Sequence, residues 1–151
     1  MSGSFFPMIA RMRYINRWGL MRNTDVENIQ EHSHMVAVLA HALAVIQNRY
    51  FGPQIDPGQA AVAALYHDAS EILTGDMPTP IKYDNPAIQQ AYKQVESVAE
   101  EKLLSMLPDD LREEFRPAIT IREHPGGGQG GGQAVGLSQV CGGGQGRQSG
   151  V

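Results

Sequence analysis

The stretch that decides the fold runs from residue 60 to residue 76 and reads AAVAALYHDASEILTGD. Its apolar first half predicts a helix, which we expect to begin at Asp56-Pro57 and to stop at Gly75. The adjacent His67 and Asp68 offer an imidazole and a carboxylate, a pair suited to a divalent metal ion. Residues three and four positions apart share a helix face, so the sequence places Glu71 beside that pair. A carboxylate there can carry a proton to or from a metal-bound water.

A histidine upstream supplies a further candidate ligand. A second helix is expected from near Asn28 to Tyr50, with Val36, Leu39, Leu43 and Ile46 on its apolar stripe. His32, His34 and His41 all fall within it, but His41 is nine residues from His32 and so lies about 180° away. The three cannot bind one metal ion. His34 and His41 are interpreted as structural.

Five blocks of sequence, taken together, resemble the HD-domain metal-dependent phosphohydrolases, and most closely the bacterial 5'-deoxynucleotidases of the YfbR type. In family order, from about Phe5 to about Ile121, they are INRW (15–18), LMRN (20–23), EHS (31–33), YHDASE (66–71) and LTGDMPTPIKY (73–83). The resemblance implies an all-α, compact helical bundle of the HD-domain type. It also implies hydrolysis of deoxyribonucleoside 5'-monophosphates to deoxynucleoside and phosphate by a homodimer.

The resemblance assigns roles to residues of this chain. It makes His32, His67 and Asp68 the metal ligands, with Co²⁺ or Mn²⁺ as the ion; the residue types alone also allow Zn²⁺, Fe²⁺ or Mg²⁺. It makes Glu71 and Arg17 catalytic, Glu71 in proton transfer and Arg17 on the phosphate.

The resemblance also implies a substrate pocket. It is formed by Arg17, Trp18, His32, Asp68, Asp76, Met77, Pro78 and Thr79. From pattern alone, a surface arginine and a core tryptophan are the favoured interpretation of Arg17 and Trp18, and the proline-containing loop is compatible with a rigid linker.

The remaining helices are predicted from the spacing of apolar residues and from the glycine, asparagine and proline residues that begin or end helices. A helical stripe runs from Phe5 to about Tyr14, and Gly19 is its expected C-cap. Asn85-Pro86 is expected to begin a helix that runs to about Met106. Its predicted apolar face consists of Ile88, Tyr92, Val95, Val98 or Ala99, and Leu103. Pro108 starts a short helix that ends near Pro117.

Composition bounds the class of protein. The chain has 151 residues, which allows one domain, and a net charge of −4, which disfavours binding to nucleic-acid polymers. The single cysteine, Cys141, forms no internal disulfide, as is typical of a reducing compartment. The sequence shows no signal peptide and no apolar run of the ~20 residues that span a bilayer. We therefore expect a cytoplasmic protein without membrane contact.

The C-terminal stretch departs from the family pattern. We expect an HD domain over residues 1–124 that is incomplete at its C-terminus, followed by a Gly/Gln-rich tail over 125–151. Residues 126–151 contain twelve of the chain's 17 glycines, one arginine and no acidic or aromatic residue, which predicts disorder. The family has a further metal-ligand aspartate here, and this tail has none. Activity is therefore expected to be impaired.

We hypothesise that a shift of reading frame produced the tail. Permissible codons for residues 129–141, read one base later, encode Lys-Ala-Ala-Asp-Lys-Leu-Ser-Ala-Tyr-Leu-Lys-Cys. That string is helical in pattern and resembles the family segment around the aspartate. Three alternatives stay open: an HD phosphohydrolase acting on nucleoside polyphosphates, a non-catalytic nucleotide-binding remnant, and a purely structural role for the His-Asp pair.

Overall fold

The computed structural model of the protein describes residues 4–19, 24–52, 55–78, 82 and 85–120. Over these residues the chain is all-α, with no strand and only an isolated bridge between Asn16 and Asn28, so the predicted fold class is confirmed. The elements are α1 (Phe5–Ile9), the 3₁₀ helix η1 (Ala10–Tyr14), α2 (Ile29–Tyr50), α3 (Pro57–Tyr66), α4 (Glu71–Thr74), α6 (Pro86–Leu104) and α7 (Asp109–Ile119).

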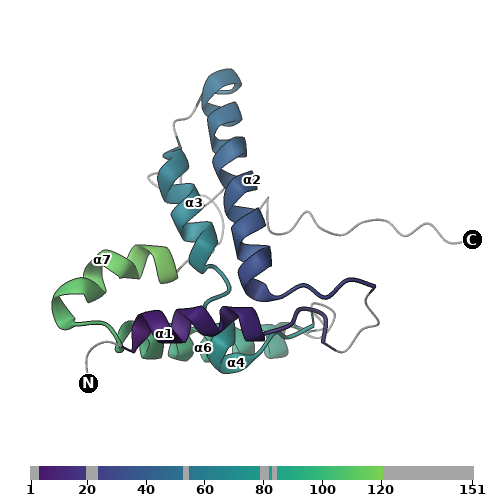
Figure 1. Ribbon diagram of the computed structural model, residues 1–151, viewed down its shortest axis with the longest axis vertical. Coiled ribbons are helices and arrows are strands. Elements are labelled where there is room, and N and C mark those ends of the chain that lie inside the picture. The colour runs from purple at the N-terminus through teal and green to yellow at the C-terminus, as the bar shows by residue number, and fades with distance from the viewer. Residues whose placement is uncertain (1–3, 20–23, 53–54, 79–81, 83–84, 121–151) are drawn as a thin grey trace, which may run out of the picture.

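Helices α2 and α3 form an upright hairpin that stands on the other helices (Figure 1). α2 begins at a capping box, in which the Asn28 side chain accepts from the backbone of Gln30 and Glu31 while the Glu31 side chain accepts from the Asn28 N–H. Such a cap is worth about 1 kcal/mol. The bounds predicted for this helix are confirmed.

Where α2 and α3 pack against each other, the contacting residues are mostly alanines and not leucines. The buried cluster between α2 and α3 consists of Val36, Ala37, Ala40, Ala44, Ala60 and Ala64. Small side chains let the two helix backbones approach closely. The predicted stripe is therefore largely wrong: Val36 is buried, but Leu39, Leu43 and Ile46 are 46–48% exposed.

The helix predicted to run through the His-Asp pair is interrupted. α3 begins as expected, with Asp56 as N-cap and Pro57 at its first position, but it ends at Tyr66. Tight turns follow, in which the Ala69 N–H donates to the Tyr66 carbonyl and the Glu71 N–H to the Asp68 carbonyl, each three residues back. These turns let Ala69, fully buried, enter the core of the lower layer. Glu71 thus begins a separate helix, α4, instead of sharing a helix with the pair.

The lower layer holds a second core. Helices α1, α4 and α6 lie across the foot of the hairpin, and α7 lies to one side (Figure 1). The buried cluster of this lower layer contains Phe5, Ala69, Leu103, Leu104, Leu107 and Ile119. The Phe5 ring meets Phe115 of α7 edge-on, with ring centroids 5.4 Å apart, which ties the N-terminus to the last described helix. α6 and α7 match their predicted bounds closely, although Val95 and Val98 of α6 are exposed rather than buried.

One predicted helix cap is wrong, although the helical segment that it belongs to ends where expected. The N-terminal helical segment ends at Tyr14, with Ile15 in extended conformation, so Gly19 caps nothing. The left-handed residue in this region is Trp18, with φ of 58°, and no other described non-glycine residue has a positive φ.

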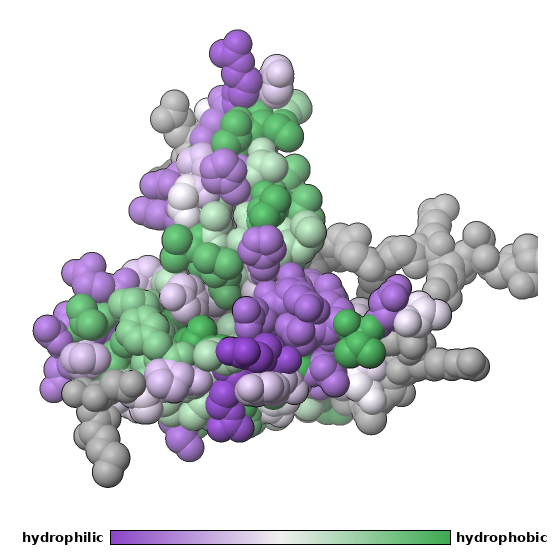
Figure 2. All heavy atoms as spheres, in the orientation of Figure 1, coloured by the Kyte–Doolittle hydropathy of each residue, from purple (hydrophilic) through white to green (hydrophobic). Residues whose placement is uncertain are grey.

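The surface separates into apolar and polar areas. Figure 2 shows apolar side chains along the upright hairpin and a polar area near its foot, where it meets the lower layer. The hairpin's half-exposed apolar residues are Met35, Val38, Leu39, Leu43, Val45, Ile46, Val62 and Leu65. Within the described part of the chain, no helix has the length and apolar character needed to cross a membrane.

Candidate metal and substrate site

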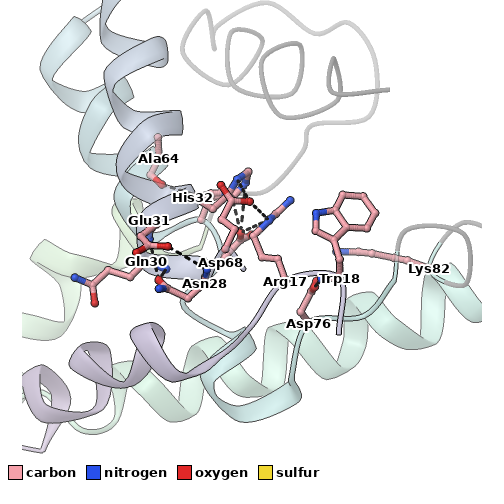
Figure 3. A network of polar contacts seen from close by, with 12 residues as sticks. Arg17, Trp18, Asn28, Gln30, Glu31, His32, Ala64, Asp68, Asp76 and Lys82 are labelled. Carbon is pink, nitrogen blue, oxygen red and sulfur yellow. Dashed lines mark hydrogen bonds and ion pairs between the residues drawn. The ribbon is translucent and has the colours of Figure 1, made fainter. Parts of the chain in front are cut away.

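The foot of the hairpin gathers the polar residues singled out in the sequence (Figure 3). His32 comes from the first turn of α2, and His67 and Asp68 come from the turn after α3. The extended segment that holds Arg17 and Trp18 runs alongside, and Asp76 follows α4.

His32, His67 and Asp68 form a cluster with the geometry of a metal site. One candidate ligand atom from each residue lies within 4.8 Å of the others. Asp68 Oδ2 is 3.1 Å from His67 Nε2 and 3.8 Å from His32 Nε2, and the two imidazole centroids are 5.3 Å apart. Two nitrogens and one carboxylate oxygen are a donor set for Zn²⁺ and other first-row divalent ions.

The tautomer of His67 shows that a cation fits this cluster. Its Nδ1 lies 2.7 Å from the carbonyl oxygen of Ala64, which accepts only, so Nδ1 carries the hydrogen. That carbonyl is among the last four of α3, which have no partner within the helix. In a neutral ring the lone pair of Nε2 then faces the Asp68 carboxylate. Two acceptors at that distance repel unless a proton or a metal ion lies with them.

The surrounding charges keep the ligands in metal-binding form. Although burial raises the pKa of Asp68, its close contacts with His67, His32 and Arg17 hold that pKa below its ordinary value. Burial, and then the neighbouring Arg17, lower the pKa of His32. Near neutral pH, Asp68 is therefore ionised and His32 neutral, as ligation requires.

Arg17 joins the cluster to the start of α2. Its Nε lies 3.0 Å from Glu27 Oε2 and one terminal nitrogen lies 3.5 Å from Asp68 Oδ2. Glu27 also approaches His32 Nδ1, at 3.9 Å. The backbone fixes this arrangement, because the Arg17 N–H donates to the Glu27 carbonyl over 2.9 Å. Sequence reasoning did not identify Glu27, which lies in an irregular segment and belongs to no periodic pattern.

Glu71 lies buried beneath this network. Its side chain is only 7% exposed, and Oε2 makes no hydrogen bond within the described chain. Burial, reinforced by the negative charges of Asp68 and Asp76, raises the pKa of Glu71 to about 9. In the absence of a metal ion, Glu71 is thus a neutral acid at physiological pH. A carboxyl whose proton is held this way can give or take a proton at the site.

Trp18 and Asp76 meet beside Arg17. The Trp18 N–H donates to Asp76 Oδ2 over 2.9 Å, and the Arg17 guanidinium lies 5.8 Å from the indole centroid. The left-handed conformation of Trp18 costs roughly 1–3 kcal/mol for a residue other than glycine. Trp18 is 36% exposed, so part of the residue is accessible to solvent beside a guanidinium and a carboxylate.

The structure also places the remaining pocket residues, the two histidines interpreted as structural, and one lysine. Met77 and Pro78 follow Asp76 and are half-buried, while Thr79 lies outside the described residues. His34 and His41 are exposed and line an apolar groove of about 320 Å³ between α2 and α3, away from the metal cluster. Sequence reasoning also missed Lys82, whose Nζ lies 2.7 Å from Glu96 Oε1 and 4.6 Å from the Tyr92 ring centroid.

Comparison with known proteins gives consistent matches. Residues 4–127 match the family described as 5'-deoxynucleotidase YfbR-like. A 5'-deoxynucleotidase of Photorhabdus laumondii is 52% identical over 120 residues, which cover 80% of this chain and 61% of that protein. One from Vibrio cholerae is 58% identical over 115 residues, covering 76% of this chain and 59% of that protein. The chain thus spans less than two thirds of the length of these curated relatives.

Solved structures agree on the fold. An HD-domain phosphohydrolase from Listeria innocua superposes with a TM-score of 0.73 at 19% identity, covering 91% of this chain and 63% of that one. The HD phosphohydrolase of cyanophage S-2L, bound to dA and one catalytic Zn²⁺ ion, gives a TM-score of 0.51 at 25% identity, covering 80% and 69%.

Proposed function

The chain belongs to the YfbR-like family of 5'-deoxynucleotidases, and we propose that its site is built to hydrolyse deoxyribonucleoside 5'-monophosphates to deoxynucleoside and phosphate. The observation that carries the proposal is the His32-His67-Asp68 cluster, with Arg17 on one side and buried Glu71 beneath. The names of the relatives and the dA bound to the cyanophage enzyme support this substrate class.

His32, His67 and Asp68 would hold one divalent ion. Co²⁺ or Mn²⁺ is proposed from the family. Zn²⁺ is a further candidate, because the cyanophage enzyme binds a catalytic Zn²⁺ ion. Fe²⁺ and Mg²⁺ also accept such ligands. When bound, the ion polarises the phosphate and lowers the pKa of a coordinated water.

The chain's own residues position the substrate and move the proton. The Arg17 fork binds phosphoryl oxygens and stabilises their charge as water attacks phosphorus and the P–O5' bond breaks. Glu71 exchanges a proton between the attacking water and the leaving O5'. Trp18 covers the nucleoside, and a wall of the pocket is formed by Asp76, Met77, Pro78 and Thr79.

We propose further that this chain is impaired. The domain is assigned to residues 1–124 and the Gly/Gln-rich tail to 125–151, and the proposed frame shift falls on residues that the structure does not describe. Three protein ligands leave the ion without the aspartate that the family supplies later in the chain. The proposed cell context, a cytoplasmic homodimer that binds neither nucleic-acid polymers nor membranes, rests on the charge of −4 and on the family.

A non-catalytic nucleotide-binding remnant is the second candidate. The Trp18–Asp76 hydrogen bond forms within this chain without any C-terminal ligand, so a nucleoside surface can persist where catalysis fails. An enzyme acting on nucleoside polyphosphates is less well supported, because the sequence adds no basic cluster for extra phosphates.

Phosphate release from deoxy-AMP with added Co²⁺ or Mn²⁺ tests the proposal. It is measured on this chain and on a version with residues 129–141 returned to the other frame and continued as in the relatives. Turnover by the restored version alone supports both the activity and the impairment. Equal turnover by both contradicts the impairment. Turnover by neither contradicts the proposed activity, and binding of deoxy-AMP without phosphate release then favours the remnant.

A further inference from the structure

Two segments far apart in the sequence meet at one hydrogen bond beside the proposed pocket. Residues 15–17 are fixed to the start of α2, because the Arg17 N–H donates to the Glu27 carbonyl and the Ile29 N–H to the Ile15 carbonyl. Trp18, the next residue, leaves this ladder, and its N–H donates instead to Asp76 Oδ2, 58 residues later in the chain.

The backbone on each side is shaped for this contact. Trp18 adopts φ of 58°, a conformation that a tryptophan rarely takes and that surrounding contacts must hold. On the other side, Gly75 adopts φ of 76° and ψ of 160°, which only glycine adopts readily. Gly75 thereby turns the chain out of α4 and brings Asp76 under Trp18 (Figure 3).

The hydrogen bond joins two groups of the protein itself, the Trp18 N–H and the Asp76 carboxylate. We propose that Asp76 is a positioning residue, whose carboxylate holds Trp18 in its left-handed conformation and so fixes the indole beside Arg17 for the nucleoside of the substrate. This inference rests on the proposed function for its purpose, although the contact itself needs neither metal nor nucleotide. It differs from a direct hydrogen bond between the Asp76 carboxylate and a sugar hydroxyl of the substrate, because the effect passes through the backbone of Trp18.

The chain offers a direct spectroscopic test, since Trp18 is its single tryptophan. Intrinsic emission and acrylamide quenching are recorded on the full chain without metal or nucleotide, alongside helix content from circular dichroism. The variants are Asp76→Asn, which keeps an acceptor oxygen, and Asp76→Leu and Asp76→Ala, which remove it. Gly75→Ala disturbs the approach of Asp76 from the other side. Asp25→Leu, on an exposed carboxylate of the loop before α2, is the matched control.

The inference expects Asp76→Leu, Asp76→Ala and Gly75→Ala to shift the emission to the red and increase quenching, with helix content retained. Asp76→Asn and the Asp25 control should match the parent chain. Equal emission from all variants overturns the inference. Loss of helix content in both Asp76→Leu and Asp76→Ala also overturns it, because the role would then be structural.

Kinetics on the frame-restored version separate this inference from the proposed function. A raised KM with a smaller change in kcat for Asp76→Leu, and a rise in KM for Asp76→Asn that is much smaller than that for Asp76→Leu, agree with positioning. Activity lost in Asp76→Asn while its emission stays at the parent value overturns it, because Asp76 would then act on the substrate directly. If the restored version turns over no nucleotide, the proposed function fails, but the fluorescence result still decides whether Asp76 holds Trp18.

Discussion

His67 Nε2 lies 3.1 Å from Asp68 Oδ2, while Nδ1 of the same ring is bonded to the last turn of α3. This helix bond fixes which nitrogen faces the carboxylate, so the ring is oriented for a cation before one arrives.

Divalent metal should stabilise the chain through this pair. At a concentration about 100 times its Kd, an ion that binds only the folded state adds about 2.7 kcal/mol to the free energy of unfolding. Added Co²⁺ or Zn²⁺ should therefore raise Tm, and His67→Ala should abolish the rise. His41→Ala is the control, since His41 is exposed on α2 outside the cluster. The same loss in both variants would show that the metal acts elsewhere.

Stability should fall as pH rises through the range in which Glu71 titrates. Its pKa is raised from an ordinary 4.5 to about 9, so between those values the folded state holds one proton more than the unfolded state. Linkage then lowers the free energy of unfolding with rising pH across this window. The lowered pKa of Asp68 acts in the opposite sense, but only in more acidic solution, below its ordinary value of 3.8.

Glu71→Gln should remove most of this pH dependence in the metal-free chain. It should also stabilise the chain near the upper end of the window by on the order of 1–3 kcal/mol. Glutamine is neutral at every pH, so folding then requires neither protonation of residue 71 nor burial of a carboxylate. Urea unfolding at several pH values measures both effects, and Glu114→Gln on an exposed carboxylate of α7 serves as control. An unchanged slope in Glu71→Gln would mean that Glu71 is ionised in the folded chain.

Arg17 should matter for turnover more than its charge alone implies. Its two nitrogens reach Glu27 and Asp68, so the guanidinium plane is already oriented, and a lysine cannot reproduce that fork. In the frame-restored version, Arg17→Lys should lower kcat for deoxy-AMP by roughly 10²-fold, the scale of losing one oriented donor to a transition-state oxygen. Arg49→Lys, at the far end of α2, should keep the parent rate. A lysine variant with parent kcat would show that only the charge is needed.

The sequence predicts those elements whose signals are local. Asn28, Asp56 and Asn85 are side-chain caps followed by helical patterns, and each helix begins where expected. Periodicity fails where tertiary packing decides. The burial of Ala69 breaks the helix at Tyr66, and close alanine packing leaves Leu43 outside the hairpin core.

The candidate site shows the same division. His32, His67 and Asp68 are recognisable as residue types, and the structure brings them together. Contacts between distant segments have no sequence signature. The bond from Trp18 to Asp76 depends on two unusual backbone conformations, and Glu27 reaches Arg17 from an irregular loop.

The half-exposed apolar face of the hairpin should make the chain self-associate. Leu39 and Leu43 lie on one side of α2, 48% and 46% exposed, and contiguous apolar surface of this kind drives association. The double variant Leu39→Lys/Leu43→Glu should shift the chain toward monomer in analytical ultracentrifugation and reduce binding of an apolar dye. Both positions lie outside the buried alanine cluster, so helix content should stay unchanged. Val26→Lys, a substitution at an exposed loop valine, is the matched control. A parent chain that is already monodisperse and monomeric at high concentration would contradict the prediction, because the face would then need no cover.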